Sequence, residues 1–268
     1  MNLLVVTPTL GASRFLESTI ASVHAAGRDL IHILVAPEVK IAAVSEVSGR
    51  SRVVPDHAAG MYEAINAGIA AAAADSWDWF TYLNDDDTWQ AAGMRVMADS
   101  LEKQKRNIDV CYGRVALINT NGATIGELPV ARNAPDIAHL LSAGIVPLAQ
   151  PGTLVRRSLL EKIGGFDNSF RSAGDLDFWV RAAGAGARFG FVSMRVASFR
   201  LHADQLSKQR DLGEQERFRA LSPIARPWGL RSAVALLRFR MGNLPVYFDR
   251  IRRHGWIPMR TLYDRADK

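Results

Sequence analysis

The sequence has little that is typical of an exported or membrane-spanning protein. Cys111 is its only cysteine, so no internal disulfide can form, which fits a reducing compartment. No uncharged apolar run approaches the roughly 20 residues that a spanning helix needs. The first residues, MNLLVVTPTLGASRF, lack a basic start, and Pro8 and Gly11 interrupt their apolar stretch. We therefore expect a cytoplasmic protein.

The composition allows a large core, and the charge is unevenly distributed. Of the 268 residues, 48% are hydrophobic and 22% charged, which suits one α/β domain with an appendage. Residues 205–268 carry 14 Lys and Arg against 6 Asp and Glu, whereas the rest carries 19 against 21. The basic character thus belongs to the C-terminal segment, unlike that of a nucleic-acid-binding domain. No aromatic-basic binding motif supports nucleic acid as a partner.

Short apolar runs alternate with amphipathic segments over about the first 105 residues. We expect strands at 3–6, 30–35, 52–54 and 79–83, and helices at 14–26, 61–74 and 88–105. This alternation predicts a parallel sheet with helices on its faces. Because ligands bind beyond the carboxyl ends of such strands, the loops 7–9 and 85–87 should open onto one rim. Further on we expect strands at 110–119, 124–128, 153–155 and 189–201, helices at 158–163 and 175–183, and a helical segment beyond 205.

Three consecutive aspartates, Asp85, Asp86 and Asp87, follow an apolar run in FTYLNDDDTW. They admit two interpretations. Aspartates at a helix start cap free N–H groups and complement the helix dipole. Three adjacent carboxylates also repel one another unless a cation offsets the repulsion, and Mg²⁺ and Mn²⁺ prefer such oxygen ligands.

An ordered series of motifs resembles those of family 2 glycosyltransferases of the GT-A fold. It runs from VVTPTLGASRFLESTIASV (5–23) through GMYEAINAGI (60–69) and YLNDDD (82–87) to GGFDN (164–168), GDLDFWVR (174–181) and SFRLHADQLS (198–207). The resemblance covers roughly residues 3–207. It implies a Rossmann-like α/β fold with a mixed, mainly parallel sheet flanked by helices. Residues 1–105 would form a donor half, 106–205 an acceptor half, and 206–268 a basic helical extension.

The resemblance also implies an activity and a set of site residues. The activity is inverting transfer of a sugar from a nucleotide-diphosphate sugar to an acceptor hydroxyl, with Mn²⁺ or Mg²⁺, in bacterial surface-polysaccharide or glycolipid synthesis. The implied catalytic base is Asp175, and the implied metal ligands are Asp86, Asp87 and His202. The implied donor-binding residues are Thr7, Pro8, Thr9, Asp56, Asn66, Asn84 and Asp85. From these residues alone, without the other motifs, an ordinary helix cap at Asp175 and a surface or otherwise satisfied histidine at His202 are the preferred interpretations.

Two positions depart from the family pattern. Gly174 replaces the Glu that usually precedes the base. Where the family carries a nucleobase-binding Asp near the end of the second strand, this sequence has Ala36 and Pro37. Asp56 would then take part of that role, and the identity of the nucleobase stays open.

The C-terminal segment interleaves apolar residues with arginines in SAVALLRFRMGNLPVYFDRIRRHGW. An amphipathic helix on an anionic membrane surface, a hairpin packed on the catalytic body, and a homodimer interface all fit this pattern. Two other functions also stay open. A nucleotidyltransferase would usually carry a Gly-rich, basic first loop, which TPTLGASRF matches poorly. A non-catalytic nucleotide-sugar or glycan-binding module would explain the two departures.

Overall fold

A computed structural model describes residues 2–27, 30–56, 60–103, 108–202, 210–224 and 229–256. Residues 57–59, the end of the SFRLHADQLS motif at 203–207 and the tail beyond 256 lie outside the described residues. Within them, nine strands form one sheet in the order β3-β2-β1-β4-β8-β6-β9-β5, with β7 paired to β6. The strands are β1 Leu3–Pro8, β2 Leu30–Pro37, β3 Arg52–Asp56, β4 Trp79–Tyr82, β5 Thr88–Trp89, β6 Val110–Ile118, β7 Thr124–Glu127, β8 Thr153–Arg156 and β9 Phe189–Arg200.

The sheet is mixed, as expected. Strands β1 to β4 are parallel neighbours, β8 runs antiparallel between β4 and β6, and β6 pairs in parallel with β9. Helices flank the sheet, and the GT-A fold predicted from the motifs is confirmed. The helices are α1 Leu16–Ala26, α2 Ile41–Val47, α3 Met61–Ala71, α4 Ala91–Lys103, α5 Ile137–Ser142, α6 Arg157–Ile163, α7 Gly174–Gly184, α8 Arg210–Leu221, α9 Leu230–Gly242 and α10 Leu244–His254.

The first strand is buried on both faces, which explains its continuous apolar run. Leu4 and Val6 enter the larger core cluster, whereas Leu3 and Val5 enter a second cluster on the opposite face. Helix α3 approaches β1 closely because of Gly68, where an added Cβ would lie 2.5 Å from Val6 Cγ1. The carboxyl end of β1 is therefore held firmly at the rim of the sheet.

Two expectations about elements were wrong. The helix predicted over 88–105 begins only at Ala91, because Thr88 and Trp89 instead form β5 and pair with β9. Helices α2 and α5 were not predicted. Both are short, at seven and six residues, so neither has enough turns to establish a helical period in the sequence.

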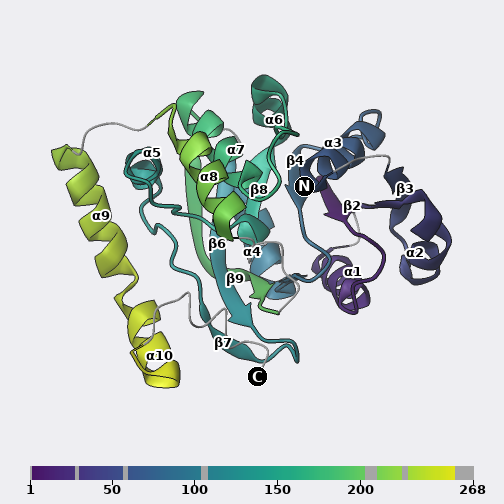
Figure 1. Cartoon of the computed structure of the whole chain (residues 1–268), viewed down its shortest axis with the longest axis horizontal. Helices are drawn as coiled ribbons and strands as arrows, with labels where there is room; N and C mark the ends of the chain where they lie inside the picture. The colour runs from purple at the N-terminus through teal and green to yellow at the C-terminus, as the bar shows by residue number, and fades with distance from the viewer. Residues whose placement is uncertain are drawn as a thin grey trace.

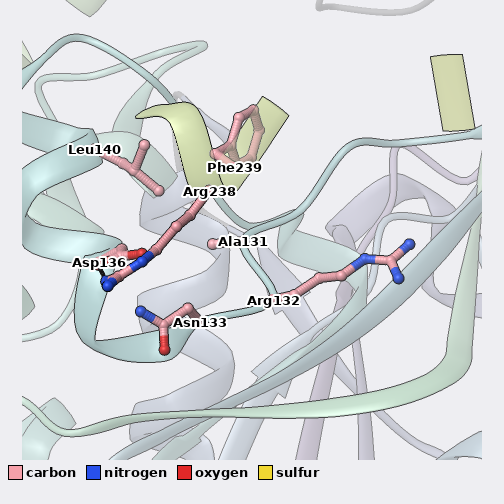
Figure 2. Close-up of a pocket in the computed structure, with 7 residues that line it drawn as sticks. All are labelled: Ala131, Arg132, Asn133, Asp136, Leu140, Arg238 and Phe239. Atoms are coloured by element: carbon pink, nitrogen blue, oxygen red, sulfur yellow. Dashed lines mark hydrogen bonds and ion pairs between the residues drawn. The ribbon is translucent and has the colours of Figure 1, made fainter. Parts of the chain in front are cut away.

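The C-terminal helices pack onto the body through narrow contacts. Helix α8 lies against α7, α9 against α5, and α10 against β7. Ala220, Ala235 and Phe239 belong to the larger core cluster. Figure 1 shows α9 and α10 along one edge of the molecule, opposite the edge formed by β3 and α2. Figure 2 shows Arg238 of α9 reaching Asp136, and these side chains form an ion pair at 3.3 Å.

Candidate active site

The aspartate turn lies between two strands and does not begin a helix. Residues 85–86 form a turn after β4, β5 follows, and α4 starts at Ala91. The helix-start interpretation is therefore wrong. Thr9 Oγ1, at the end of β1, donates a hydrogen bond to Asp85 Oδ2 at 2.5 Å. The two loops thus meet at one rim, as the strand pattern predicted.

His202 and Asp86 are brought together by the end of β9. The His202 Nε2 atom lies 2.8 Å from Asp86 Oδ2, and the imidazole centroid is 5.5 Å from the ring of Phe15. The guanidinium of Arg200 lies 4.3 Å above the same phenyl ring. Its Nε donates to the carbonyl oxygen of Asp86 at 2.8 Å. Arg200 and Phe15, which sequence reasoning missed, therefore hold the turn and the histidine in place.

Asp87 points inward and ties the turn to its neighbours. Its Oδ1 accepts the Arg200 backbone N–H at 2.9 Å, and its carbonyl oxygen accepts the Thr19 hydroxyl at 2.7 Å. Burial, followed by the charge of Asp86, raises the pKa of Asp87 well above its ordinary range. Burial likewise raises the pKa of Asp85 to about 6, although the hydrogen bond from Thr9 opposes the shift.

The turn has oxygen donors that suit a hard divalent cation. Among the described residues, no three His, Cys, Asp or Glu side chains group closely enough to form a metal centre on their own. However, Asn84 Oδ1, Asp86 Oδ1 and Asp87 Oδ2 are buried without a hydrogen-bond partner. Mg²⁺ is commonly held by one or two carboxylates with phosphate oxygens completing its shell. The residues present therefore fit a cation shared with a diphosphate.

Of the residues predicted to bind the donor, some lie at the rim of the sheet and one is buried in the interior. Thr7 is fully buried, and its hydroxyl lies 3.1 Å from Nε2 of His32, whose pKa burial lowers to about 3. Thr7 thus contacts a neutral histidine in the interior, whereas Pro8 and Thr9 sit at the rim. Asp56 pairs in register with Pro37. A carboxylate therefore stands at the sheet edge where the second-strand Asp was expected.

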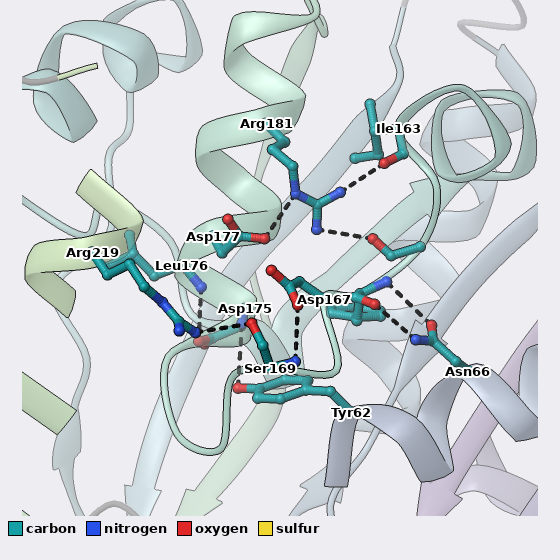
Figure 3. Close-up of polar contacts among 12 residues, drawn as sticks. Tyr62, Asn66, Ile163, Asp167, Ser169, Asp175, Leu176, Asp177, Arg181 and Arg219 are labelled. Carbon is teal, nitrogen blue, oxygen red and sulfur yellow. Dashed lines mark hydrogen bonds and ion pairs between the residues drawn. The ribbon is translucent and has the colours of Figure 1, made fainter. Parts of the chain in front are cut away.

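Asn66 links the GMYEAINAGI and GGFDN motifs through hydrogen bonds. Its Nδ2 donates to Phe166 O and to Asn168 Oδ1, both at 2.7 Å, and its Oδ1 accepts the Phe166 N–H. Gly165 has a φ of +72°, and an added Cβ would lie 2.9 Å from Asn66 Oδ1, so the turn needs glycine. Arg181 donates to the carbonyl oxygens of Ile163 and Gly165 at 2.7 and 2.9 Å. These contacts fix the loop that follows α6 (Figure 3), and the donor-binding role of Asn66 stays a prediction.

Asp175 is the second residue of α7 and keeps one carboxylate oxygen open. Its Oδ1 accepts the Leu176 N–H at 2.8 Å, a local bond of the kind that the helix-cap interpretation expects. Its Oδ2 has no hydrogen bond within the part of the chain that the structure describes. The Tyr62 hydroxyl accepts the Asp175 N–H at 3.2 Å (Figure 3). It also donates to Ser172 O at 3.1 Å.

Protein surrounds Asp175, although part of its surface stays accessible. Burial raises the pKa of its carboxyl to about 6, and the backbone N–H groups of Leu176 and Asp175 oppose the shift. At neutral pH the carboxyl is therefore mostly ionised, and it is a stronger base than an ordinary aspartate. Such a carboxylate can accept a proton from a bound hydroxyl group.

Tyr82 lies near both Asp175 and the aspartate turn. Burial is the main reason that the pKa of Tyr82 is raised, and the charges of Tyr62, Asp175 and Asp87 add to it. Tyr82 is the last residue of β4, two positions before Asn84. Asp175 and Asp87 are thus both close enough to the buried Tyr82 for their charges to affect its pKa.

The Gly174 departure has a steric cause. A Cβ at this position would lie 2.7 Å from Tyr62 Cε2. The tyrosine ring also stacks on Phe166, with centroids 5.7 Å apart. The ring therefore occupies the space that a side chain at 174 would need. Tyr62 lies inside the GMYEAINAGI motif, which was the signal that could have identified it.

Comparison with known proteins agrees with this geometry. The profile of Glycosyl transferase family 2 matches residues 4–164. The crystal structure of S. aureus TarS 1–349 in complex with UDP-GlcNAc superposes with a TM-score of 0.64 at 15% identity, covering 100% of this chain and 82% of that one. Mannosyltransferase PcManGT from Pyrobaculum calidifontis, in complex with GDP-Man and Mn²⁺, gives 0.61 at 15% identity, covering 98% and 78%. No curated protein matched the sequence.

The fold and the site together define a glycosyltransferase of GT-A architecture. The chain belongs to glycosyl transferase family 2, whose profile spans more than half of its length.

Proposed function

We propose that the protein transfers a sugar from a nucleoside-diphosphate sugar to an acceptor hydroxyl, with inversion at the anomeric carbon. The observation that carries this proposal is the open Oδ2 of Asp175, on a carboxylate that lies near Tyr82 as the Asp85–Asp87 turn does. One general base, with no enzyme nucleophile, suits a single displacement at the anomeric carbon.

In this mechanism Asp175 accepts the proton of the acceptor hydroxyl as its oxygen attacks the anomeric carbon. The new C–O bond forms on the face opposite the diphosphate, and the bond from the anomeric carbon to the diphosphate oxygen breaks. Asp86, with Asp87 and His202, would hold Mn²⁺ or Mg²⁺ at the diphosphate. The cation would neutralise the charge that develops on the leaving group.

The donor would lie across Pro8, Thr9, Asn84 and Asp85, with Asp56 toward the nucleobase. Thr7 and Asn66 would support this site through their contacts with His32 and Phe166. The complexes of TarS with UDP-GlcNAc and of PcManGT with GDP-Man and Mn²⁺ support a nucleotide-sugar donor. They also support metal use. Family membership favours glycosyl transfer over the nucleotidyltransferase alternative.

The test is a thermal-shift panel of UDP, GDP, dTDP and CMP, each with and without Mn²⁺, on wild type and Asp86→Ala. We expect one diphosphate to stabilise the wild type in a Mn²⁺-dependent manner, and the variant to lose this effect. The donor carrying that nucleotide is then assayed for transfer. Stabilisation by no nucleotide would contradict the proposal, and binding without turnover would favour the non-catalytic alternative.

We further propose that residues 206–268 form an extension of the 1–205 domain that rests on an anionic membrane surface. No helix in the described ranges is long and apolar enough to cross a bilayer. On α9, four exposed apolar residues at helical spacing form a ridge opposite the buried Ala235 and Phe239. This apolar ridge consists of Leu230, Val234, Leu237 and Met241, and the exposed Arg231 and Arg240 lie beside it.

The charge around the ridge favours lipid over a second copy of the chain. Residues 229–256 contain six arginines and one acidic residue, Asp249. A homodimer through α9 would bring two cationic helices together, which like-charge repulsion opposes. An anionic lipid surface would attract each arginine. The acceptor would then be lipid-linked, on the inner face of a bacterial cell membrane, in polysaccharide or glycolipid synthesis.

Vesicle flotation tests this placement. We expect binding to vesicles containing phosphatidylglycerol and little binding to pure phosphatidylcholine, with Leu237→Glu abolishing it. Gln215→Glu, at an exposed position of α8, tests whether a new negative charge alone has this effect. Equal binding of wild type and Leu237→Glu, or a dimer that Leu237→Glu dissociates in sedimentation, would contradict the membrane proposal.

A further inference from the structure

One face of α8 rests on the loop that precedes the base-bearing helix. The Arg219 guanidinium lies 3.7 Å from the centroid of the Phe170 ring and donates to Ser169 Oγ at 3.2 Å. One turn earlier, Glu216 lies over residues 171–173. The spacing of three residues between Glu216 and Arg219 places both on one side of the helix. Helix α8 lies beyond the part of the chain that the family profile matches.

Glu216 accepts three consecutive backbone N–H groups. Its Oε1 accepts the amide of Arg171 at 2.8 Å, and its Oε2 accepts those of Ser172 and Ala173 at 2.7 and 2.9 Å. The residue is only 6% exposed. Burial raises the pKa of its carboxyl, but the three amides outweigh this effect, so the pKa is lowered overall. An ionised carboxylate at these amides also complements the dipole of α7.

The N-cap position of α7 supplies no side-chain acceptor, although Asp175 accepts the Leu176 N–H within the first turn. The N-cap residue, Ala173, has no side chain that could accept a hydrogen bond, and Gly174 follows. Glu216 instead accepts, from another helix, the N–H groups of the three residues that lead into α7. The amide of Asp175, two residues after Ala173, donates to the Tyr62 hydroxyl. The turn that presents the base is thus held between α3 and α8.

We propose that Glu216 is a positioning residue that fixes the conformation of the Asp175 turn. This inference rests on the proposed function, in which Asp175 is the base. Charge-assisted hydrogen bonds are stronger than neutral ones, and buried N–H groups that lose them must find water. Without the Glu216 carboxylate the turn would open to solvent. The Asp175 carboxyl would then be better hydrated, and its basicity and direction would change together.

The experiment compares Glu216→Gln with Glu214→Gln, an exposed residue of the same helix. The first readout is hydrogen exchange of the amides of 171–176, measured by mass spectrometry on the full-length protein. We expect exchange to be about tenfold faster in Glu216→Gln, and unchanged in β1 and α1. Glu214→Gln should match the wild type throughout.

The second readout is the pKa of Asp175, followed by ¹³C NMR of protein labelled at aspartate, with Asp175→Asn providing the assignment. We expect a lower pKa in Glu216→Gln and no change in Glu214→Gln. If Glu216 only stabilised the turn and did not affect Asp175, Glu216→Gln would speed amide exchange but leave the pKa of Asp175 unchanged. That result would overturn the proposal. Unchanged exchange would overturn it too.

Should Glu216→Gln not fold, Glu216→Asp serves instead. It keeps the charge but shortens the reach, so the same two changes are expected at smaller size, and their absence would equally refute the proposal. Failure of the proposed function would look different. Asp175→Asn would then retain full transfer, whereas exchange and pKa would still respond to Glu216.

Discussion

The His202 Nε2 atom lies 2.8 Å from Asp86 Oδ2 across a sequence separation of 116 residues. The pair joins the turn after β4 to the end of β9, and the Asp87–Arg200 hydrogen bond lies beside it. Whether His202 binds the cation directly or orients Asp86, its loss should weaken metal binding.

We therefore predict that His202→Asn lowers the affinity for Mn²⁺ in the presence of the selected nucleotide by about 10- to 100-fold. Nucleotide-dependent thermal shifts across a Mn²⁺ titration measure this change. His139→Asn, a partly buried histidine on α5, is the matched control and should leave the titration curve in place. An unchanged curve for His202→Asn would remove this histidine from the metal site.

Asp175→Asn should lower turnover by about 10²- to 10⁴-fold, because the amide cannot accept the acceptor proton. Nucleotide binding should persist, since the residue lies on the acceptor side of Tyr82. Steady-state rates with the selected donor, together with the thermal-shift assay, separate the two effects. Retention of wild-type turnover would exclude Asp175 as the base.

The pH dependence of turnover should reflect the same carboxyl. Its pKa is raised to about 6, so the ionised, active fraction falls below that pH. We expect kcat/KM to decrease about tenfold per pH unit below pH 6 and to level off above pH 7. A profile that stays flat down to pH 5, with donor binding intact, would contradict this assignment.

The raised pKa of Asp175 should also make the free energy of unfolding depend on pH. Because folding raises the pKa of Asp175 above the ordinary value of 3.8, the native state binds its proton more tightly than the unfolded chain does. The resulting stabilisation is complete below pH 4 and is lost as pH rises through 6. Asp175→Asn should then be more stable than wild type at pH 7.5, by at most about 3 kcal/mol.

Urea unfolding of both proteins at pH 4, 5, 6 and 7.5 measures this difference, which should grow between pH 4 and 6 and then stay constant. A difference that does not vary with pH would show that the substitution acts through packing alone.

Gly174→Ala should destabilise the protein by about 1–3 kcal/mol, because its Cβ would lie 2.7 Å from the Tyr62 ring. Gly174→Glu, which restores the residue typical of the family, should be at least as harmful. Gly184→Ala is the control on the same helix, since nothing lies within 4 Å of its added Cβ. Equal unfolding free energies for the two alanine variants would contradict the steric argument.

Much of the site could be predicted because its motifs lie at strand ends. Thr9 and Asp85 were expected at one rim, and they are hydrogen-bonded. The contacts that orient the site were not predicted. Tyr62 is one of several apolar or aromatic residues in its motif, and Arg200 is one of 33 basic residues, so neither identity reveals a partner. Glu216 lies outside every motif, and its role depends on where α8 packs.

The sequence by itself determined most of the strands and the longer helices, the chemistry of the acidic turn and the presence of a single candidate base. These features depend on local patterns, such as runs of apolar residues and adjacent carboxylates, whose effects are complete within a few residues. The tertiary structure alone decided that β5 replaces the first turn of a helix, that Tyr62 fills the space beside Gly174, and that Glu216 of α8 holds the turn before α7. Each of these depends on how segments tens to more than a hundred residues apart pack against one another. Local propensity contains no record of that packing.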